Sequence, residues 1–166
     1  MKCLKAVLIG FFLFGLLSLA GAQSKLDSIY EANLTKKYIN GNYIPATMKD
    51  AFRELINAST ESSLDTFKEG DEEIIARRLH FGLGRWISVK WNFYEGSRFT
   101  KYLNELGVSN PDDMISYTII SFHRFINERS LELEKRGAVY KEKREAEYKE
   151  KLKNAKTIST RKIKKN

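Results

Sequence analysis

The chain of 166 residues has a single cysteine, Cys3, and it lies inside an apolar N-terminal segment. Met1 to Lys5 is a short basic start, Ala6 to Ala20 is uncharged and apolar, and Ala20-Gly21-Ala22 is a small-residue cleavage site. This succession predicts a secretory signal peptide over residues 1–22. Its removal would leave a mature chain without thiols, so we expect the fold to be held by close packing and not by disulfides.

An uncut membrane anchor is the alternative interpretation of the same segment. Ala6 to Ala22 offers 17 uncharged positions, whereas a spanning helix needs about 20 apolar residues. No second apolar stretch of this kind follows in the sequence. We therefore expect an exported protein, periplasmic, at the cell surface or extracellular, that is not transmembrane after signal cleavage.

From Tyr43 to Asn127 the apolar residues recur at steps of three and four, which is typical of helices packed on one face. Capping residues precede these runs at Thr47, at Ser97 and at Ser109 or Asn110. The sequence thus predicts an all-α fold, a compact bundle of about five short helices over residues 43–127. The ten aromatic residues between Phe81 and Phe125 are expected to form the centre of its core.

The flanking segments differ in composition from this domain. Residues 23–42 are polar and are predicted to be a linker or a loosely docked arm. Residues 128–156 are rich in Glu, Lys and Arg, which predicts a charged, solvated helix that continues the last core helix and is weakened at Gly137 by about 1 kcal/mol. Residues 157–166 are predicted to be a disordered basic tail. Seven of the 29 lysines and arginines lie in the last sixteen residues, so the net charge of +8 is largely a property of this end.

Both histidines of the protein, His80 and His123, fall among glycines, arginines and acids of the predicted domain. One hypothesis makes His80, His123, Asp112 and Asp113 the acid–base groups of a small hydrolase or a metal-dependent enzyme. The other makes the histidines hydrogen-bonded core residues and the two acids ordinary residues of a helix N-terminus, with Gly82 and Gly84 ending the preceding helix. We favour the second because capping alone explains these residues, and because no ligand spacing such as H-E-x-x-H occurs. We expect no metal and no cofactor.

Arginines and tryptophans of the same region are candidates for a binding surface that would meet a protein or an envelope polymer. The candidate binding residues are Arg85, Trp86, Trp91, Arg98 and Arg124. Trp91, Phe93 and Tyr94 either stand exposed in a connection, ready to stack on sugar rings or a partner, or fill the core. The basic tail is expected to be solvated, with weak contact to anionic surfaces as the alternative. No nucleic-acid partner is expected, because aromatic residues do not interleave with the basic ones after Tyr148.

The order of several short blocks resembles a bacterial domain of unknown function that occurs in small proteins, several of them from the Bacteroidota. The blocks are His80-Phe-Gly-Leu-Gly-Arg-Trp-Ile, Trp91, Gly96-Ser97-Arg98, Lys101-Tyr-Leu-Asn-Glu-Leu-Gly, Pro111-Asp-Asp-Met and His123-Arg124. The resemblance covers about Tyr43 to Asn127 and implies no activity. The hypothesis from the sequence is a non-enzymatic binding or interaction module of the bacterial envelope.

Overall fold

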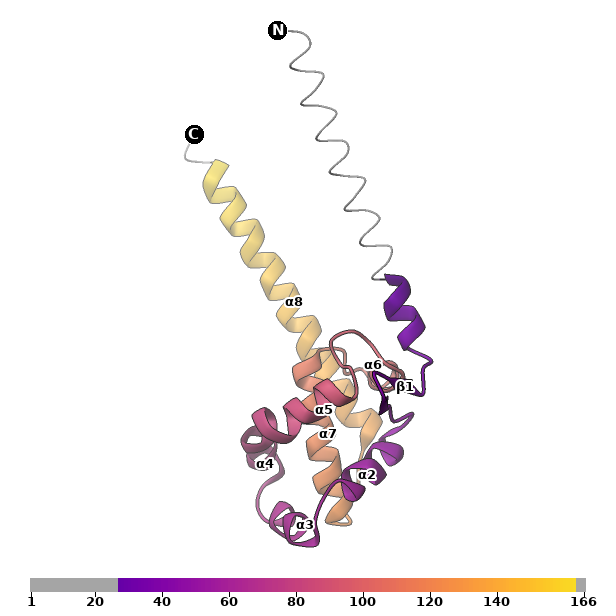
Figure 1. Ribbon diagram of the computed structural model, residues 1–166. Coiled ribbons are helices and arrows are strands. Elements are labelled where there is room, and N and C mark those ends of the chain that lie inside the picture. Colours follow the sequence, from indigo (N-terminus) through magenta and orange to yellow (C-terminus); the bar gives the residue numbers. More distant parts are fainter. Residues whose placement is uncertain (1–26, 164–166) are drawn as a thin grey trace.

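The computed structural model describes residues 27–163, and their side chains as far as residue 155 (Figure 1). The predicted signal peptide, residues 1–22, lies outside the described residues. The described part is mostly helical and has a single two-residue antiparallel strand pair, so the predicted all-α fold is confirmed. Its elements are β1 (Tyr38–Ile39), β2 (Asn42–Tyr43), α2 (Met48–Asn57), α3 (Glu61–Lys68), α4 (Glu72–Leu79), the π-helical turn η1 (His80–Gly84), α5 (Arg85–Lys90), α6 (Arg98–Glu105), α7 (Pro111–Ile126) and α8 (Leu133–Ile163).

The predicted caps begin the helices where the sequence places them. Thr47 accepts a hydrogen bond from the Asp50 amide, and Ser97 forms a reciprocal capping box with Thr100. Asn110, with Pro111 in the first turn, caps α7. Each cap satisfies amides that have no partner inside their own helix.

Helix α7 is the central element, and α2, α3, α4, η1 and α5 all contact it (Figure 1). Between Asp113 and His123 nearly every side chain of α7 is buried. A helix that is buried on all sides needs neighbours on every face. The surrounding helices supply a core that includes Phe52, Phe99 and Leu103.

Helices α4 and α5 are joined by η1 into one continuous helical segment over residues 72–90. The prediction that Gly82 and Gly84 end the preceding helix was wrong. Gly84 instead allows close packing, because a Cβ at this position would overlap the Ile115 side chain of α7. Because Gly84 has no side chain, the π-helical turn lies directly against the central helix.

The N-terminal part of the described chain is more structured than the predicted linker over residues 23–42. Residues 27–33 are helical, and the β1–β2 pair brings Ile39 into the core. The Tyr30 ring lies so close to Gly96 that a side chain at Gly96 would overlap it, and Asn33 donates to the Glu95 carbonyl at 3.4 Å. The arm is therefore docked on the connection before α6.

The prediction that the charged helix continues the last core helix was wrong, because α7 ends at Ile126 and α8 begins separately at Leu133. The chain reverses over residues 127–132, and the first turns of α8 return along α7 (Figure 1). Burial raises the pKa of Tyr117 to about 12, and its hydroxyl donates to the Leu133 carbonyl at 2.6 Å. Arg136 lies over the ring of Tyr117 at 4.8 Å. This half of α8 is thus part of the packed body.

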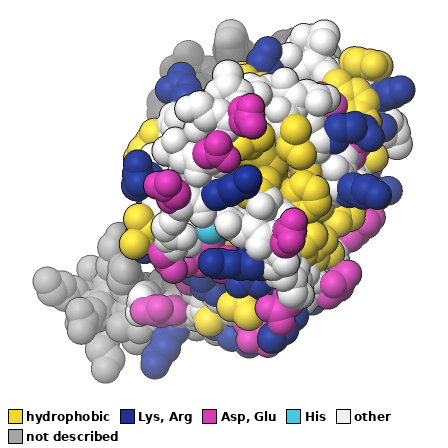
Figure 2. All heavy atoms as spheres, turned by 90° about the horizontal axis from the view of Figure 1, so that it is seen from below, with side chains coloured by type: hydrophobic (Ala, Val, Ile, Leu, Met, Phe, Trp, Pro, Cys, Tyr) yellow, Lys and Arg dark blue, Asp and Glu magenta, His cyan; other side chains and the backbone are white. Residues whose placement is uncertain are grey.

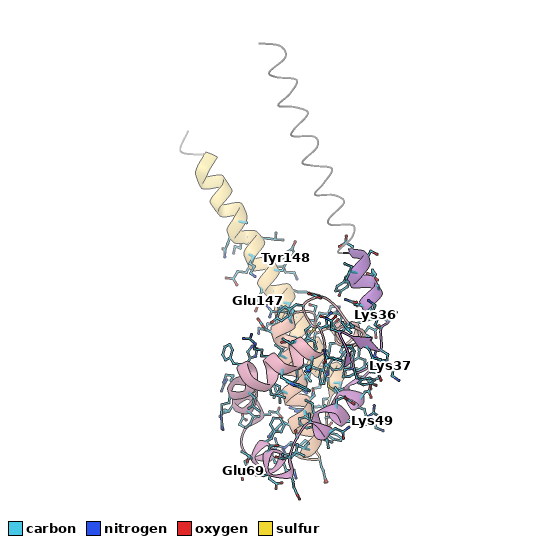
Figure 3. The ribbon with its side chains drawn as sticks, in the orientation of Figure 1. Lys36, Lys37, Lys49, Glu69, Glu147 and Tyr148 are labelled. Atoms are coloured by element: carbon cyan, nitrogen blue, oxygen red, sulfur yellow. The ribbon has the colours of Figure 1, made fainter. Side chains whose placement is uncertain are left out.

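The far half of α8 projects beyond the body, where Glu147 and Tyr148 mark its departure (Figure 3). The helix extends to Ile163, so the prediction that disorder begins at residue 157 was wrong for residues 157–163; residues 164–166 lie outside the described part. No helix within residues 27–163 has the length and apolar character needed to cross a membrane.

The aromatic residues between Phe81 and Phe125 divide between core and surface. Trp91, Phe93 and Phe99 are buried and contact one another edge-on or tilted. Phe81 and Tyr94 are exposed. The aromatic-rich stretch therefore builds part of the core, but it also leaves large rings in solvent.

Candidate functional site

The four predicted acid–base residues lie in three separate places. His80, at the start of η1, faces Asp112 in the first turn of α7, with His80 Nε2 3.9 Å from Asp112 Oδ1. Together with Phe81 and Arg85 they line a surface pocket of about 350 Å³. This is the part of the predicted constellation that the structure brings together.

His123 lies elsewhere, at the other end of α7. It is fully buried, its ring meets Phe67 edge-on at 5.6 Å, and its Nε2 lies 3.3 Å from the Asn127 side-chain amide. His123 lies eleven positions after Asp112, the partner of His80, and this spacing is a rise of about 16 Å along the helix axis. The two imidazoles therefore cannot act on the same atom of a substrate.

Asp113 is a structural residue that anchors α8. It is buried, it forms an ion pair with Arg144, and Lys143 Nζ lies 3.9 Å away. No group of three or more metal-ligating side chains occurs within the described residues. The predicted His–Asp cluster is thus a His80–Asp112 pair with two members placed elsewhere.

Of the predicted binding arginines, Arg98 and Arg124 hold the fold together. Arg98 Nε donates to the Ile44 carbonyl at 2.7 Å, and its guanidinium lies over the Tyr43 ring at 5.1 Å. Arg124 Nε and Nη2 donate to the Glu72 carboxylate, which joins α7 to α4 and raises the pKa of the arginine. Both guanidiniums are therefore occupied inside the protein.

The two tryptophans differ in exposure. Trp91 is buried, with its ring edge-on to Phe99 at 5.2 Å, whereas Trp86 is partly exposed and meets Trp91 at 6.1 Å. Arg85 is exposed and forms no ion pair within the described residues. Of the five predicted binding residues, Arg85 and Trp86 are the two that reach the surface with groups left for a partner.

The structure adds exposed apolar residues that the sequence analysis did not place together. Phe81 is 86% exposed, Tyr94 is 67% exposed and Val89 is 65% exposed, and all three line the His80–Asp112 pocket. A signal for Phe81 was present in its spacing, because Leu79 and Leu83 face inward and the residue midway between them points away on a helix. We call Phe81, Arg85, Val89 and Tyr94, with His80 and Asp112, the η1 face.

The fold and this site define a small all-α domain built around one buried helix. A family model described as Domain of unknown function (DUF6794) matches residues 44–126, half of the chain, and the chain therefore belongs to this family. The predicted resemblance to a domain of unknown function is thus confirmed. No curated protein and no solved structure matches the chain.

Proposed function

We propose that this protein is an exported binding module of the bacterial envelope, and that the η1 face is where it docks a partner protein. The observation that carries the proposal is Phe81, a large apolar ring that is 86% exposed on a π-helical turn. Turns of this kind are frequent at functional sites. A partner that covers an exposed apolar ring removes it from water, and this burial stabilises the complex.

The neighbours of Phe81 have the composition of an interface centre. Val89 and Tyr94 add exposed apolar surface, and Arg85 adds a guanidinium that has no partner in the described protein. Aromatic residues and arginine dominate the energetic centres of protein interfaces. The pocket of about 350 Å³ between these side chains would receive one anchoring side chain of the partner.

The enzymatic alternative has less support. It needs His80, His123, Asp112 and Asp113 in one site, but His123 is in the core and Asp113 is engaged with Arg144. His80 and Asp112, 3.9 Å apart, form one pair, and no group of three metal-ligating side chains occurs within the described residues. Their position beside Phe81 suits a polar contact at the edge of an interface.

The test is site-specific photo-crosslinking in cells that make the protein, with a photoreactive phenylalanine analogue at position 81. Position 148 is the matched control, because Tyr148 is also an exposed ring, at 63%, and lies on the projecting part of α8 (Figure 3). We expect a discrete protein adduct from position 81, lost in a Val89→Ser, Tyr94→Ser background, and none from position 148. No protein adduct, or an adduct with an envelope polymer instead, would contradict the proposal.

A further inference from the structure

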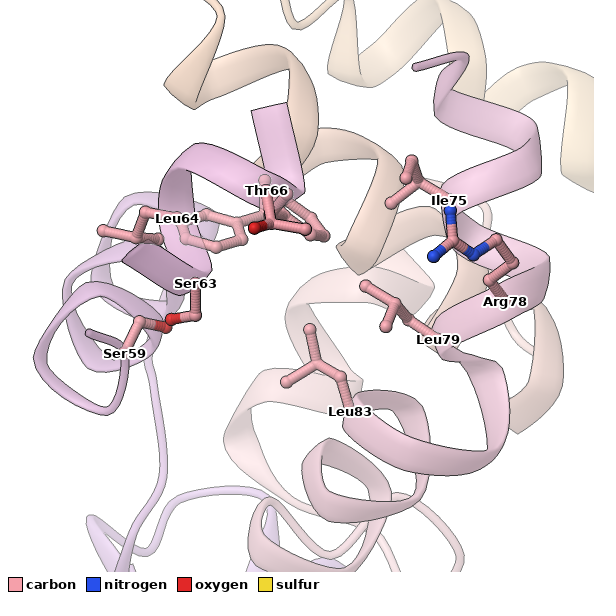
Figure 4. A pocket seen from close by; sticks show the side chains of 10 residues that line it. Ser59, Ser63, Leu64, Thr66, Ile75, Arg78, Leu79 and Leu83 are labelled. Carbon is pink, nitrogen blue, oxygen red and sulfur yellow. The ribbon is translucent and has the colours of Figure 1, made fainter. Parts of the chain in front are cut away.

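A second, apolar pocket opens between α3 and α4, away from the η1 face. Its volume is about 250 Å³, and Leu64, Phe67, Ile75, Leu79 and Leu83 supply most of its walls. Figure 4 shows the side chains of α3 and those of α4 and η1 facing one another across it. A dry cavity of about 150 Å³ already admits benzene, so this pocket has room for a larger apolar group.

A neighbouring pocket of about 260 Å³ shares Ser59, Leu83 and Phe122 with it. Trp86 lies at the far side of this extension. Hydrophobic side chains gather between charged ones on the end of the molecule seen in Figure 2, the end at which α3 lies in Figure 1. We call these two adjacent pockets the groove, and their mainly apolar lining is typical of small-ligand sites.

The polar side chains of this groove include one unpaired charge. Of the described residues that line the pocket, Arg78 is the only charged one. Its guanidinium is exposed and forms no ion pair or hydrogen bond within the described residues. Ser63 and Thr66, opposite Arg78 in Figure 4, donate their hydroxyl protons to backbone carbonyls of α3 and its cap. The unpaired positive charge therefore favours an anionic group beside Arg78.

We infer that the groove binds a free single-chain amphiphile with an anionic head group, such as a fatty acid. The chain would lie along Leu79, Leu83 and Phe122, and the carboxylate would pair with Arg78. Burial of the chain supplies most of the affinity, and the guanidinium selects the charge of the head group. The groove and the η1 face share no lining residue, so this inference and the proposed docking function can fail independently.

The test is titration of the protein with decanoate below its micellar concentration, followed by calorimetry and by tryptophan emission, to which Trp86 and the adjacent Trp91 both contribute. We expect saturable binding of decanoate and weaker binding of 1-decanol. Arg78→Gln should weaken decanoate binding about fivefold, and Arg77→Gln, the matched control, less than twofold. Arg77 is its exposed neighbour and does not line the pocket. Circular dichroism verifies that both variants are folded.

Three results would overturn the inference. Absence of decanoate binding would exclude an acyl ligand. Equal binding of decanoate and decanol, unchanged in Arg78→Gln, would exclude selection of an anion. Binding to phosphatidylglycerol vesicles without binding of free decanoate would assign this end of the molecule to a membrane surface instead.

Discussion

Gly137 shows at the scale of a single residue how packing can override helix propensity. A glycine inside α8 weakens an isolated helix by about 1 kcal/mol relative to alanine. In the folded protein, however, a Cβ at this position would overlap the carbonyl oxygen of Leu106. Gly107, with a φ of +95°, lies directly against the same stretch of backbone. The two glycines let α8 contact the end of α6 at backbone distance.

We therefore predict that Gly137→Ala lowers the free energy of unfolding by about 2 kcal/mol, the usual effect of overpacking. Gly82→Ala is the control, because a Cβ at Gly82 has no atom within 4 Å. It should leave stability unchanged or raise it by up to about 1 kcal/mol. Urea unfolding followed by circular dichroism measures both. A stabilised Gly137→Ala variant would show that α8 does not approach α6 this closely.

At the scale of elements, α8 completes the family domain from outside its boundary. The family match ends at residue 126. Two residues of α7 within the match nevertheless have their interaction partners on α8. Arg144 forms an ion pair with the buried Asp113, and the Leu133 carbonyl accepts from Tyr117. Leu131, Leu133 and Tyr140 also pack against the core, and burial of one such side chain contributes about 1.5–3 kcal/mol.

A chain that ends at Asn127 loses this apolar burial, so its stability should fall by at least about 3 kcal/mol or it should fail to fold. A chain that ends at Glu150 keeps these contacts and should differ from the full chain by less than about 0.5 kcal/mol. Urea unfolding of the three chains tests this expectation. Equal stability of the chain ending at Asn127 would mean that the domain folds without α8.

Local signals explain which elements the sequence predicted correctly. Thr47, Ser97 and Asn110 accept hydrogen bonds from amides within three residues, so their role as helix caps can be predicted without knowledge of the fold. The reversal before α8 had no such signal, because Glu128 and Glu132 adopt positive φ where glycine would have marked a turn.

The candidate site was only partly predictable, because its residues are brought together by packing and not by a local signal. His80 and Asp112 meet through the packing of η1 on α7, a contact between residues 32 positions apart.

At the scale of the whole molecule, the continuous helical segment over residues 72–90 separates two surfaces. Phe81, Arg85 and Val89 project from one side of it, and Leu79, Leu83 and Trp86 line the groove on another. Both surfaces remain accessible because α8 packs on a different part of α7 and then leaves the body (Figure 1). A partner on the η1 face would therefore leave the groove open.

The proposed envelope function requires that the protein is exported. We predict that the secreted or periplasmic protein begins at Gln23, as intact-mass spectrometry would show. Because Cys3 is the only cysteine, the processed protein should not react with a maleimide. A Leu13→Arg variant, whose apolar run carries a charge, should stay unprocessed, keep the thiol and react. A full-length, maleimide-reactive wild-type protein in the membrane fraction would show instead that the segment stays uncut as an anchor.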